Sequence, residues 1–405
     1  MASTHDSDVQ YEDEHGEFTV RRRKMAAPSK PAKGVRKEPR PRRSQRLWLI
    51  FPLGAIFWVM ACALSESAID PVPITFPARV PDVNLDDRLS SAARMFEGMI
   101  TGPECIISVK GVLYTGSING TIFKIEDGVL SKFAQLGPAG CFSMETCGRP
   151  LGLHYDETRD RILVADAYLG LFALDLSTGK PTKIFPRDGS KVTLFNALTT
   201  LPDGRIVLSE SSQKFQLKEL IYDFLEGRPT GRLLLIDPDS GEWKVLADNL
   251  FFANGVVLHS DGNSVLVAET GNTTIRRVPL NGGPSEVFTD QLPGMPDNLS
   301  KSPRGGYWVS LVVSRLPGKT NFYVAVAKYP WIRYLCYKFI PLRLLRSFAS
   351  LNNRGLIVRI DDSGQIVESL YDPSGNIFNV ADVLELDGVL WLGSYYANFV
   401  GKFVL

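Results

Sequence analysis

Residues 251 to 270 read FFANGVVLHSDGNSVLVAET, and they display the unit from which the fold can be inferred. Val256 to Leu258 form a short apolar run, an Asp261-Gly262 turn follows, and Ser264 to Ala268 form a second apolar run. Two β-rich runs joined by an Asp-Gly turn are typical of two antiparallel strands. The stretch therefore predicts a hairpin whose first strand is preceded by the polar residue Asn254.

This unit recurs along the chain. Similar runs begin at Cys105, Pro150, Leu194, Met295 and Val380, which makes six units in all. A period of about 45 residues with about four strands per unit is the signature of a β-propeller, in which each unit is one blade. An irregular β-sandwich or two β domains are the alternatives, but units two to four follow one another without a linker. We predict an all-β, six-bladed β-propeller over residues 101–405.

A propeller brings equivalent positions of different blades to one mouth of its channel, because the first strand of each blade lines the axis. The residues just before these strands are polar in four units: Glu104, Asn196, Asn254 and Asp297. Two carboxylates and two amides, without Cys or His, suit a hard cation with oxygen ligands, above all Ca²⁺. The alternative is that these residues cap strand ends in a solvated channel.

The amino-terminal part of the chain differs from the rest in charge. Twelve of the 45 basic and seven of the 44 acidic residues lie in residues 1–46, so the remainder is mildly acidic. A mildly acidic body argues against nucleic acid as a partner. The first 46 residues contain few apolar side chains to bury, and we expect them to form a disordered, basic cytosolic tail.

Residues 47 to 64, LWLIFPLGAIFWVMACAL, carry no charge and are just long enough to cross a thin bilayer core. Basic residues precede the segment and Glu66 and Asp70 follow it. The positive-inside rule then predicts a type II single-pass membrane protein whose propeller is lumenal or extracellular, in the endoplasmic reticulum or at the plasma membrane. A cleaved signal peptide is the alternative, which the long basic region before the segment disfavours.

Two further segments lie outside the β repeat. Residues 65–100 are expected to form a linker, with Ile74 to Phe76 as a strand that closes the last blade and Asp82 to Met99 as a short amphipathic helix. Residues 315–352 interrupt blade five with an apolar, basic and helix-like pattern. This insertion is expected to form a lid over the channel, to rest on the membrane interface, or to pack as a helical pair on the blades' edge.

Cysteines and sequons give local expectations. Cys141 and Cys147 lie six residues apart in a loop and are predicted to form a disulfide, whereas Cys105 and Cys336 are expected to be buried. Sequons at Asn119 and Asn272 lie in predicted turns and are candidate glycosylation sites on a lumenal domain. Asn298 is also in a sequon, but it is next to Asp297 at the channel mouth, and we expect no glycan there.

Candidate acid–base residues are few. The sequence contains neither a G-x-S-x-G nucleophile elbow nor a G-x-G-x-x-G loop. His154 and His259 lie at or just after inner strands, and Asp166 ends a second strand. Each is a candidate general base, although a lone histidine on a strand is more often simply packed.

Several motifs together resemble the strictosidine synthase-like family: GPECI, CGRPLGL, VADAYLGLF, FANGVVL, GMPDNLS, YPWIR and DGVLWLGSY. The resemblance covers nearly all of the chain after Leu64. It implies a six-bladed propeller related to paraoxonases and gluconolactonases, whose channel Ca²⁺ is held by residues that match Glu104, Asn196, Asn254, Asp297 and Asn298 here. It also implies an arylesterase-like activity on small esters, since membrane-anchored relatives are described as arylesterases.

Two departures from the family's pattern narrow this expectation. Ala381 stands where strictosidine synthases use a glutamate, so alkaloid condensation is not expected, and Asp166-Ala167 stand where the histidine pair of paraoxonases would be sought. The sequence leaves two hypotheses. One is a membrane-anchored, Ca²⁺-dependent esterase or lactonase that hydrolyses a small ester or lactone. The other is a non-catalytic propeller that binds a protein or small ligand around a structural Ca²⁺.

Overall fold

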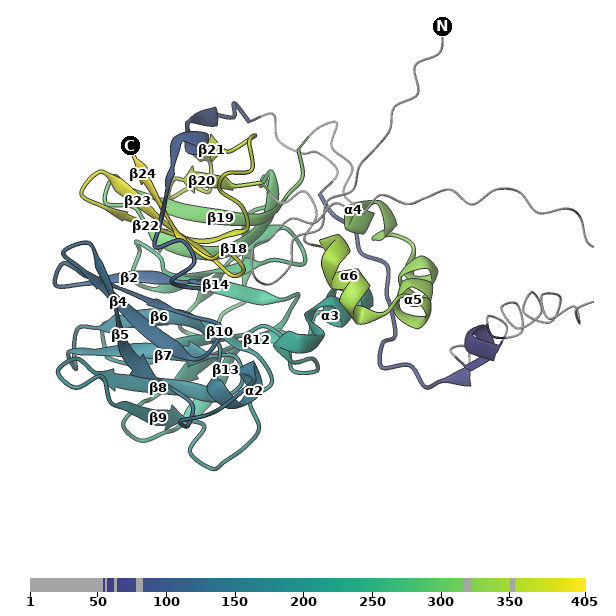
Figure 1. Ribbon diagram of the computed structural model, residues 1–405, viewed down its shortest axis with the longest axis horizontal. Helices are drawn as coiled ribbons and strands as arrows, with labels where there is room; N and C mark the ends of the chain where they lie inside the picture. The colour runs from purple at the N-terminus through teal and green to yellow at the C-terminus, as the bar shows by residue number, and fades with distance from the viewer. Residues whose placement is uncertain (1–53, 55–56, 62–63, 78–82, 317–321, 350–353) are drawn as a thin grey trace, which may run out of the picture. The chain divides into compact units, whose positions relative to one another are not determined.

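The computed structural model describes residues 54, 57–61, 64–77, 83–316, 322–349 and 354–405. The repeats form six four-stranded sheets, and each inner strand contacts the inner strands of the two neighbouring sheets, so that the sheets close into a ring (Figure 1). Neighbouring strands within each sheet are antiparallel. The prediction of an all-β, six-bladed β-propeller is therefore confirmed.

Strands of the same rank recur in every blade. The inner strands are β2 (Ile106–Val109), β6 (Pro150–Asp156), β10 (Phe195–Thr200), β14 (Ala253–Leu258), β18 (Gly294–Lys301) and β22 (Val380–Leu386). The second strands are β3 (Val112–Gly116), β7 (Arg161–Asp166), β11 (Ile206–Glu210), β15 (Ser264–Glu269), β19 (Tyr307–Ser314) and β23 (Val389–Ser394). The third strands are β4 (Thr121–Glu126), β8 (Gly170–Asp175), β12 (Gly231–Ile236), β16 (Thr274–Pro279), β20 (Leu356–Ile360) and β24 (Val400–Val404). The outer strands are β5 (Val129–Gln135), β9 (Pro181–Phe185), β13 (Trp243–Leu250), β17 (Glu286–Thr289), β21 (Ile366–Tyr371) and β1 (Ala93–Met95).

The hydrophobic core lies between neighbouring blades. On β7, Ile162 and Val164 pack against blade one, whereas Leu163 and Ala165 pack against blade three. Successive side chains of a strand point to opposite faces of its sheet. Because both faces are covered, these second strands are near-continuous apolar runs rather than alternating ones.

The last blade is closed by an early strand, but not by the one that was predicted. Ala93 pairs with Lys402 and Met95 with Val400, so that β1 becomes the fourth strand beside β24. The prediction for Ile74 to Phe76 was wrong. The N–H of Ile74 donates instead to the carbonyl of Ala327 at 3.1 Å. Prolines stand directly before Ile74 and directly after Phe76, and a proline cannot donate to a strand ladder.

The helix predicted over residues 82–99 is also wrong. A five-residue 3₁₀ helix, η1 (Asp87–Ser91), occupies part of this stretch. The Asp86 carboxylate caps its start by accepting from the N–H of Arg88, and Ala92 is already extended at its end. The apolar positions of the stretch are divided between this short turn and β1.

Apart from the helical residues described at 54, 57–61 and 64, the remaining described helices lie on loops at one mouth of the ring. We call this the near mouth, where the inner strands begin; the far mouth is where they end. The helices are α2 (Met144–Cys147) before β6, η2 (Leu217–Glu219) and α3 (Leu220–Glu226) between β11 and β12, and α4 (Phe322–Val326), α5 (Pro330–Phe339) and α6 (Leu342–Ala349) between β19 and β20. Figure 1 shows α3 beside α5 and α6, with which it is in contact.

The predicted membrane segment falls largely outside the described residues. Of residues 47–64, the structure describes only 54, 57–61 and 64, and the predicted tail 1–46 lies wholly outside. Within the described part of the chain, no helix combines the length and apolar character needed to cross a bilayer. The predicted disulfide is present, since Cys141 and Cys147 are bonded beside α2, and Cys105 and Cys336 are free and buried.

Candidate functional site

The near mouth is built from equivalent positions of the inner strands. Asn196, Asn254 and Asp297 each lie where the pairing of the inner strand with the second strand shifts register. Such a bulge re-aims a side chain that a regular ladder would hold against the sheet. The same shift occurs in blades two and six, where the corresponding residues are Leu151 and Ala381. The ring of equivalent positions is thus polar in blades one, three, four and five.

Glycines allow neighbouring inner strands to come close at this level. A Cβ atom on Gly152 would lie 2.5 Å from the carbonyl oxygen of Asn196, and one on Gly255 would lie 2.5 Å from the Cα of Asn298. Contacts this short exclude a side chain at either position. The glycines therefore bring the polar residues of adjacent blades together near the axis.

Two hydroxyls orient the amides. Ser211 Oγ donates to the carbonyl of Ala253 at 2.6 Å and accepts from Asn196 Nδ2 at 3.0 Å. In the next blade, Thr270 Oγ1 donates to the carbonyl of Pro296 at 2.7 Å and accepts from Asn254 Nδ2 at 3.2 Å. A hydroxyl has one proton, so a hydroxyl that donates it to a carbonyl can only accept from the amide. Both amide oxygens are therefore turned away from the hydroxyls.

Three side-chain oxygens of the ring have no hydrogen-bond partner among the described residues. Among the described residues, Oδ1 of Asn196, Oδ1 of Asn254 and Oδ1 of Asp297 are buried and accept no hydrogen bond. A buried polar atom without a partner costs about 1–3 kcal/mol, so three of them in one ring call for an explanation. Asn298 beside them has a buried Nδ2 without a partner, and a half-turn of this amide would present an oxygen instead.

The carboxylates of the ring are held in an unfavourable environment for their charge. Burial raises the pKa of Glu104 to about 7, an effect that Arg149 opposes and Asp382 reinforces. Burial also raises the pKa of Asp297 well above its ordinary value, and the nearby Glu104 raises it further. Both shifts have the sign expected for carboxylates that lack sufficient positive charge nearby.

The residue-based prediction missed two charged neighbours. Arg149 is buried and donates to Glu104 Oε2 at 2.9 Å and to the carbonyl of Gly102 at 2.8 Å. Asp382 is buried as well; its Oδ2 accepts from the N–H of Ile106 at 2.9 Å, and burial raises its pKa to about 6. A signal existed for Arg149, because a basic residue directly before an inner strand, as in CGRPLGL, reaches the same mouth.

These observations test whether the predicted cation fits. The described residues contain no group of three or more His, Cys, Asp or Glu side chains placed to hold a metal ion, so a cation here would need the amide oxygens. Asn196, Asn254 and Asp297 supply three unused buried oxygens, and Glu104 adds a second carboxylate. Oxygen-only ligands with two carboxylates match the preference of Ca²⁺. The residues present therefore fit the ion.

Asp166 is the candidate acid–base residue that lies at the near mouth. It ends β7 opposite Pro150, and its Oδ1 accepts from the N–H groups of Tyr168 and Leu169 at 3.0 and 2.8 Å. Its buried Oδ2 accepts no hydrogen bond in the described part of the chain. Burial raises its pKa to about 6, although the two N–H groups and Arg149 act against this rise.

The two histidines lie elsewhere. His154 follows Leu151 by three residues along β6, roughly 10 Å at the rise of a strand, and its Nε2 is 2.9 Å from Thr200 Oγ1. Burial lowers its pKa to about 4. His259 follows β14 at the far mouth, where it stacks on Tyr307 and its Nδ1 lies 3.2 Å from Asp261 Oδ2. Neither histidine is placed with the ring of Glu104 and Asp297.

An apolar wall adjoins the ring. Leu151 belongs to a buried cluster that also contains Tyr168, Phe252 and Ala327, with Phe224 and Tyr323 packed against it. The rings of Phe224 and Phe252 are 4.9 Å apart, and those of Phe224 and Tyr323 are 5.7 Å apart. The helices of blades three and five thus supply aromatic side chains to the near mouth.

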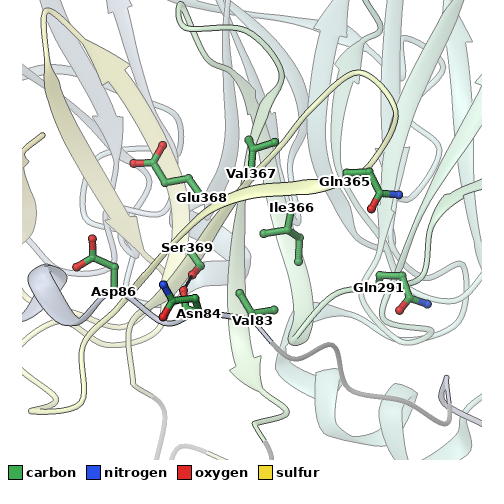
Figure 2. A pocket seen from close by; sticks show the side chains of 9 residues that line it. All are labelled: Val83, Asn84, Asp86, Gln291, Gln365, Ile366, Val367, Glu368 and Ser369. Carbon is green, nitrogen blue, oxygen red and sulfur yellow. Dashed lines mark hydrogen bonds between the residues drawn. The ribbon is translucent and has the colours of Figure 1, made fainter.

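A surface hollow of about 500 Å³ is separate from the ring. It lies along the outer strand β21, and Figure 2 shows its lining by Val83, Asn84, Asp86, Gln291 and residues 365–369. The segment before η1 runs beside β21 here, because the N–H of Tyr371 donates to the carbonyl of Asp86 at 2.7 Å. This hollow contains none of the residues predicted for the site.

The two predicted glycosylation sites differ in accessibility. Asn119 is exposed in the loop between β3 and β4. Asn272 is half-buried, and its Nδ2 donates to Glu269 Oε1 at 2.8 Å. Because a glycan is attached at Nδ2, this hydrogen bond competes with attachment at Asn272.

Comparison with known proteins agrees with this architecture. The chain is 34% identical to adipocyte plasma membrane-associated protein of Gallus gallus over 355 residues, covering 84% of this chain and 85% of that protein. It is also 34% identical to the Homo sapiens protein of that name over 361 residues, covering 85% and 86%. The chain belongs to the adipocyte plasma membrane-associated protein family. Models described as "Strictosidine synthase" and "Strictosidine synthase-like, N-terminal" match residues 196–282 and 86–125.

The fold of this adipocyte plasma membrane-associated protein family member is shared with solved structures. A gluconolactonase from Xanthomonas campestris superposes with a TM-score of 0.52 at 15% identity, covering 83% of this chain and 95% of that one. The strictosidine synthase match contains Asn196 and Asn254. The family and the fold are thereby shown.

Proposed function

We propose that this protein is a membrane-anchored, Ca²⁺-dependent hydrolase of small aryl esters or lactones. The observation that carries the proposal is the set of three buried oxygens at the near mouth, on Asn196, Asn254 and Asp297, which accept no hydrogen bond among the described residues. A gluconolactonase shares the fold, and the resemblance to the strictosidine synthase-like family implies an arylesterase-like activity. Both support a hydrolase at this position.

The residues of the near mouth have separate proposed roles. Glu104, Asn196, Asn254, Asp297 and Asn298 would hold Ca²⁺. When bound, Ca²⁺ supplies Lewis acidity that polarises a carbonyl and stabilises an oxyanion. Arg149 holds the Glu104 carboxylate through its hydrogen bond to Oε2, which keeps that oxygen in a fixed position.

Asp166 is the proposed general base. With a pKa of about 6 it is mostly ionised at neutral pH, and its Oδ2 is unused by hydrogen bonds in the described residues, so it can accept a proton from water. The apolar wall of Leu151, Phe252 and Phe224 would receive the aryl or alkyl part of the substrate and exclude bulk water.

The test uses the full chain in detergent micelles, with bound-metal analysis and phenyl acetate hydrolysis. We expect one bound Ca²⁺, and turnover that a chelator abolishes and added Ca²⁺ restores. Asp166→Asn should lower kcat by about 10² to 10⁴-fold while the ion is retained. Asn281→Ala, which changes an exposed asparagine of the same blade as Asn254, should alter neither quantity. Ester hydrolysis that is unaffected by the chelator would overturn the proposal.

A second candidate function is a non-catalytic propeller that binds a protein or small ligand around a structural Ca²⁺. The placement of His154 and His259 away from the ring favours it, because the described residues then provide no histidine base at the near mouth. Bound Ca²⁺ whose removal lowers Tm, together with the absence of ester cleavage, would select this candidate.

For the location, we propose that residues 47–64 anchor the chain and that the propeller is lumenal or extracellular. Relatives are named plasma membrane-associated proteins, and the Cys141–Cys147 disulfide suits an oxidising compartment. Protease added outside sealed microsomes should remove the tail 1–46 and leave the propeller intact. Digestion of the propeller in sealed microsomes would contradict this topology.

A further inference from the structure

The helix α5 in the blade-five insertion has apolar side chains on two sides. Ile332 and Cys336 pack inward in a hydrophobic cluster, and a second apolar face is exposed. Trp331, Tyr334 and Leu335 are spaced to lie on one face of the helix, and all three are exposed, with Trp331 62% exposed. Arg333 on the opposite face is 0% exposed. An ordinary surface helix buries its apolar face and exposes its basic one.

The orientation of α5 is held by hydrogen bonds of Arg333. Its Nη1 donates to the carbonyl of Leu225 at 2.6 Å, and its Nη2 donates to the carbonyl of Val72. These bonds tie α5 to α3 and to the extended segment before the propeller. The guanidinium therefore fixes which face of α5 is turned outward.

All charged residues of the insertion are basic. Residues 315–352 contain seven Lys or Arg and no Asp or Glu, although the chain after residue 46 is mildly acidic. Lys328, three residues before Trp331, is exposed, and so are Arg343 and Leu344 on α6. Exposed aromatic and aliphatic side chains bordered by basic ones match the phospholipid interface, where rings lie at headgroup level and cations meet phosphates.

The chain that follows the proposed anchor lies on this same face. Lys338, one turn beyond Tyr334 and Leu335, donates to the carbonyl and hydroxyl of Ser65 and to the carbonyl of Glu66. Tyr337 Oη accepts from the N–H of Ala68 at 3.0 Å. Trp331 and Lys338 are separated by seven residues, which is roughly 10 Å along a helix. A segment that leaves the bilayer at Leu64 would therefore reach α5 within one or two residues.

We propose that the exposed face of α5, formed by Trp331, Tyr334 and Leu335, is seated in the phospholipid interface of the membrane that residues 47–64 anchor, with the exposed Lys328 and Arg343 of the same insertion available to its phosphates. This inference rests on the proposed anchor and is independent of the proposed hydrolysis. Because α3 and α4 supply the aromatic wall of the near mouth and α3 contacts α5, the near mouth is held beside the lipid surface. Taken together with the proposed hydrolysis, this arrangement favours amphiphilic esters that partition into membranes as substrates.

The experiment places an environment-sensitive nitrobenzoxadiazole label on Trp331→Cys in the full chain carrying Cys62→Ser. The protein is reconstituted into phosphatidylcholine vesicles that contain lipids spin-labelled near the headgroup. The matched control is Val129→Cys, because Val129 is an apolar residue 64% exposed at the far mouth. We expect at least a threefold stronger quenching by the spin-labelled lipid at position 331 than at position 129, and the reverse order for quenching by aqueous iodide.

The outcomes distinguish the seating of α5 from the membrane anchor and from the proposed hydrolysis. Equal iodide quenching at the two positions, in protein that resists carbonate extraction, would overturn the seating of α5 and leave the anchor intact. Shielding in native membranes but not in phosphatidylcholine vesicles would assign this face to a protein partner and also overturn it. Release by carbonate would overturn both the anchor and the seating. Hydrolysis of water-soluble phenyl acetate by Trp331→Ser should remain unchanged, so a failure here does not depend on the proposed catalysis.

Discussion

Asp297 at the near mouth and Asp261 at the far mouth are the same residue type in neighbouring blades, and their surroundings are opposite. Burial acts to raise the pKa of Asp261, but hydrogen bonds from Asn263 N–H, Arg277 and Ser264 lower it overall. Asp297 is fully enclosed, its Oδ1 accepts no hydrogen bond among the described residues, and its pKa is well above the ordinary value. The Asp261 carboxylate stabilises a turn, whereas Asp297 Oδ1 forms no hydrogen bond within the described residues.

Turns between the third and outer strands, on the same side of the ring as the far mouth, repeat the arrangement of Asp261. Asp175, Asp237 and Asp361 each accept N–H groups from residues two to four positions further along the turn. At the near mouth, the hydroxyls of Ser211 and Thr270 orient the amides of Asn196 and Asn254. The Oδ1 atoms of both amides accept no hydrogen bond among the described residues. The acidic residues of these far-side turns are therefore satisfied locally, whereas the ring of the near mouth keeps oxygens that accept no hydrogen bond among the described residues.

The largest effect, on Ca²⁺ affinity, is expected when Asp297 and Asp261 are each replaced by asparagine in separate variants. Asp297→Asn removes a charged ligand, and we expect Ca²⁺ affinity to fall about 100-fold, equivalent to about 2.7 kcal/mol. Asp261→Asn should leave the affinity unchanged while lowering the free energy of unfolding by about 1–2 kcal/mol, because it weakens the turn's hydrogen bonds. Isothermal titration calorimetry and denaturant unfolding measure the two quantities. Equal losses of affinity would erase the distinction between the mouths.

The next effect concerns pH. Glu104 in the folded protein keeps its proton up to a pH of about 7, whereas in the unfolded chain it releases the proton near its ordinary value of 4.5. Raising the pH across this interval therefore favours the unfolded chain, and metal-free protein should lose on the order of 2 kcal/mol of stability. Added Ca²⁺ should restore stability most strongly above pH 7, where the ligand is ionised.

Thermal unfolding in chelator, measured from pH 4.5 to 8, checks this expectation. Glu104→Gln should reduce the slope, which the raised pKa values of Asp297, Asp166 and Asp382 keep from reaching zero, and loss of the partner of Arg149 lowers stability at every pH. A metal-free protein whose stability rises over this interval would show that Glu104 is an ordinary carboxylate like those of the far mouth.

A smaller effect is expected from the hydroxyls that orient the amides. Ser211→Ala removes the acceptor of Asn196 Nδ2, so that the amide can turn and present its nitrogen to the axis. We expect a loss of Ca²⁺ affinity of about tenfold, or about 1.4 kcal/mol. Ser264→Ala, which removes a hydroxyl at the far mouth, is the matched control and should have no effect on affinity. Unchanged affinity in Ser211→Ala would mean that the orientation is set by something else.

The smallest effect is a difference between two sequons of the near-mouth loops. Asn119 is exposed, whereas Nδ2 of Asn272 donates to Glu269, so Asn119→Gln should remove a glycan and Asn272→Gln should not. Electrophoretic mobility before and after treatment with a glycosidase measures this in protein made in animal cells. Mobility that is unchanged in Asn119→Gln would argue against a lumenal propeller.

Much of the fold followed from local patterns. Turn residues and paired apolar runs were sufficient to find six blades, and the same register indicated Glu104, Asn196, Asn254 and Asp297 as one ring. The closing strand was misplaced because β1 is only three residues long and has no clear alternation, so its pairing depends on the open edge of β24. Arg149 was not assigned a role, since its contact with Glu104 joins residues 45 positions apart.

The sequence by itself determined the repeat, its register and the residue types at each blade's turn, because hairpins and strand periodicity depend on neighbours along the chain. Tertiary structure decided which atoms of those residues are left unused. Asn196 presents its oxygen because Ser211 gives its proton to Ala253 of the next blade, and Glu104 and Asp297 hold protons unusually tightly because different blades enclose them together. Burial and contacts between blades exist only in the closed ring, which is why no stretch of sequence records them.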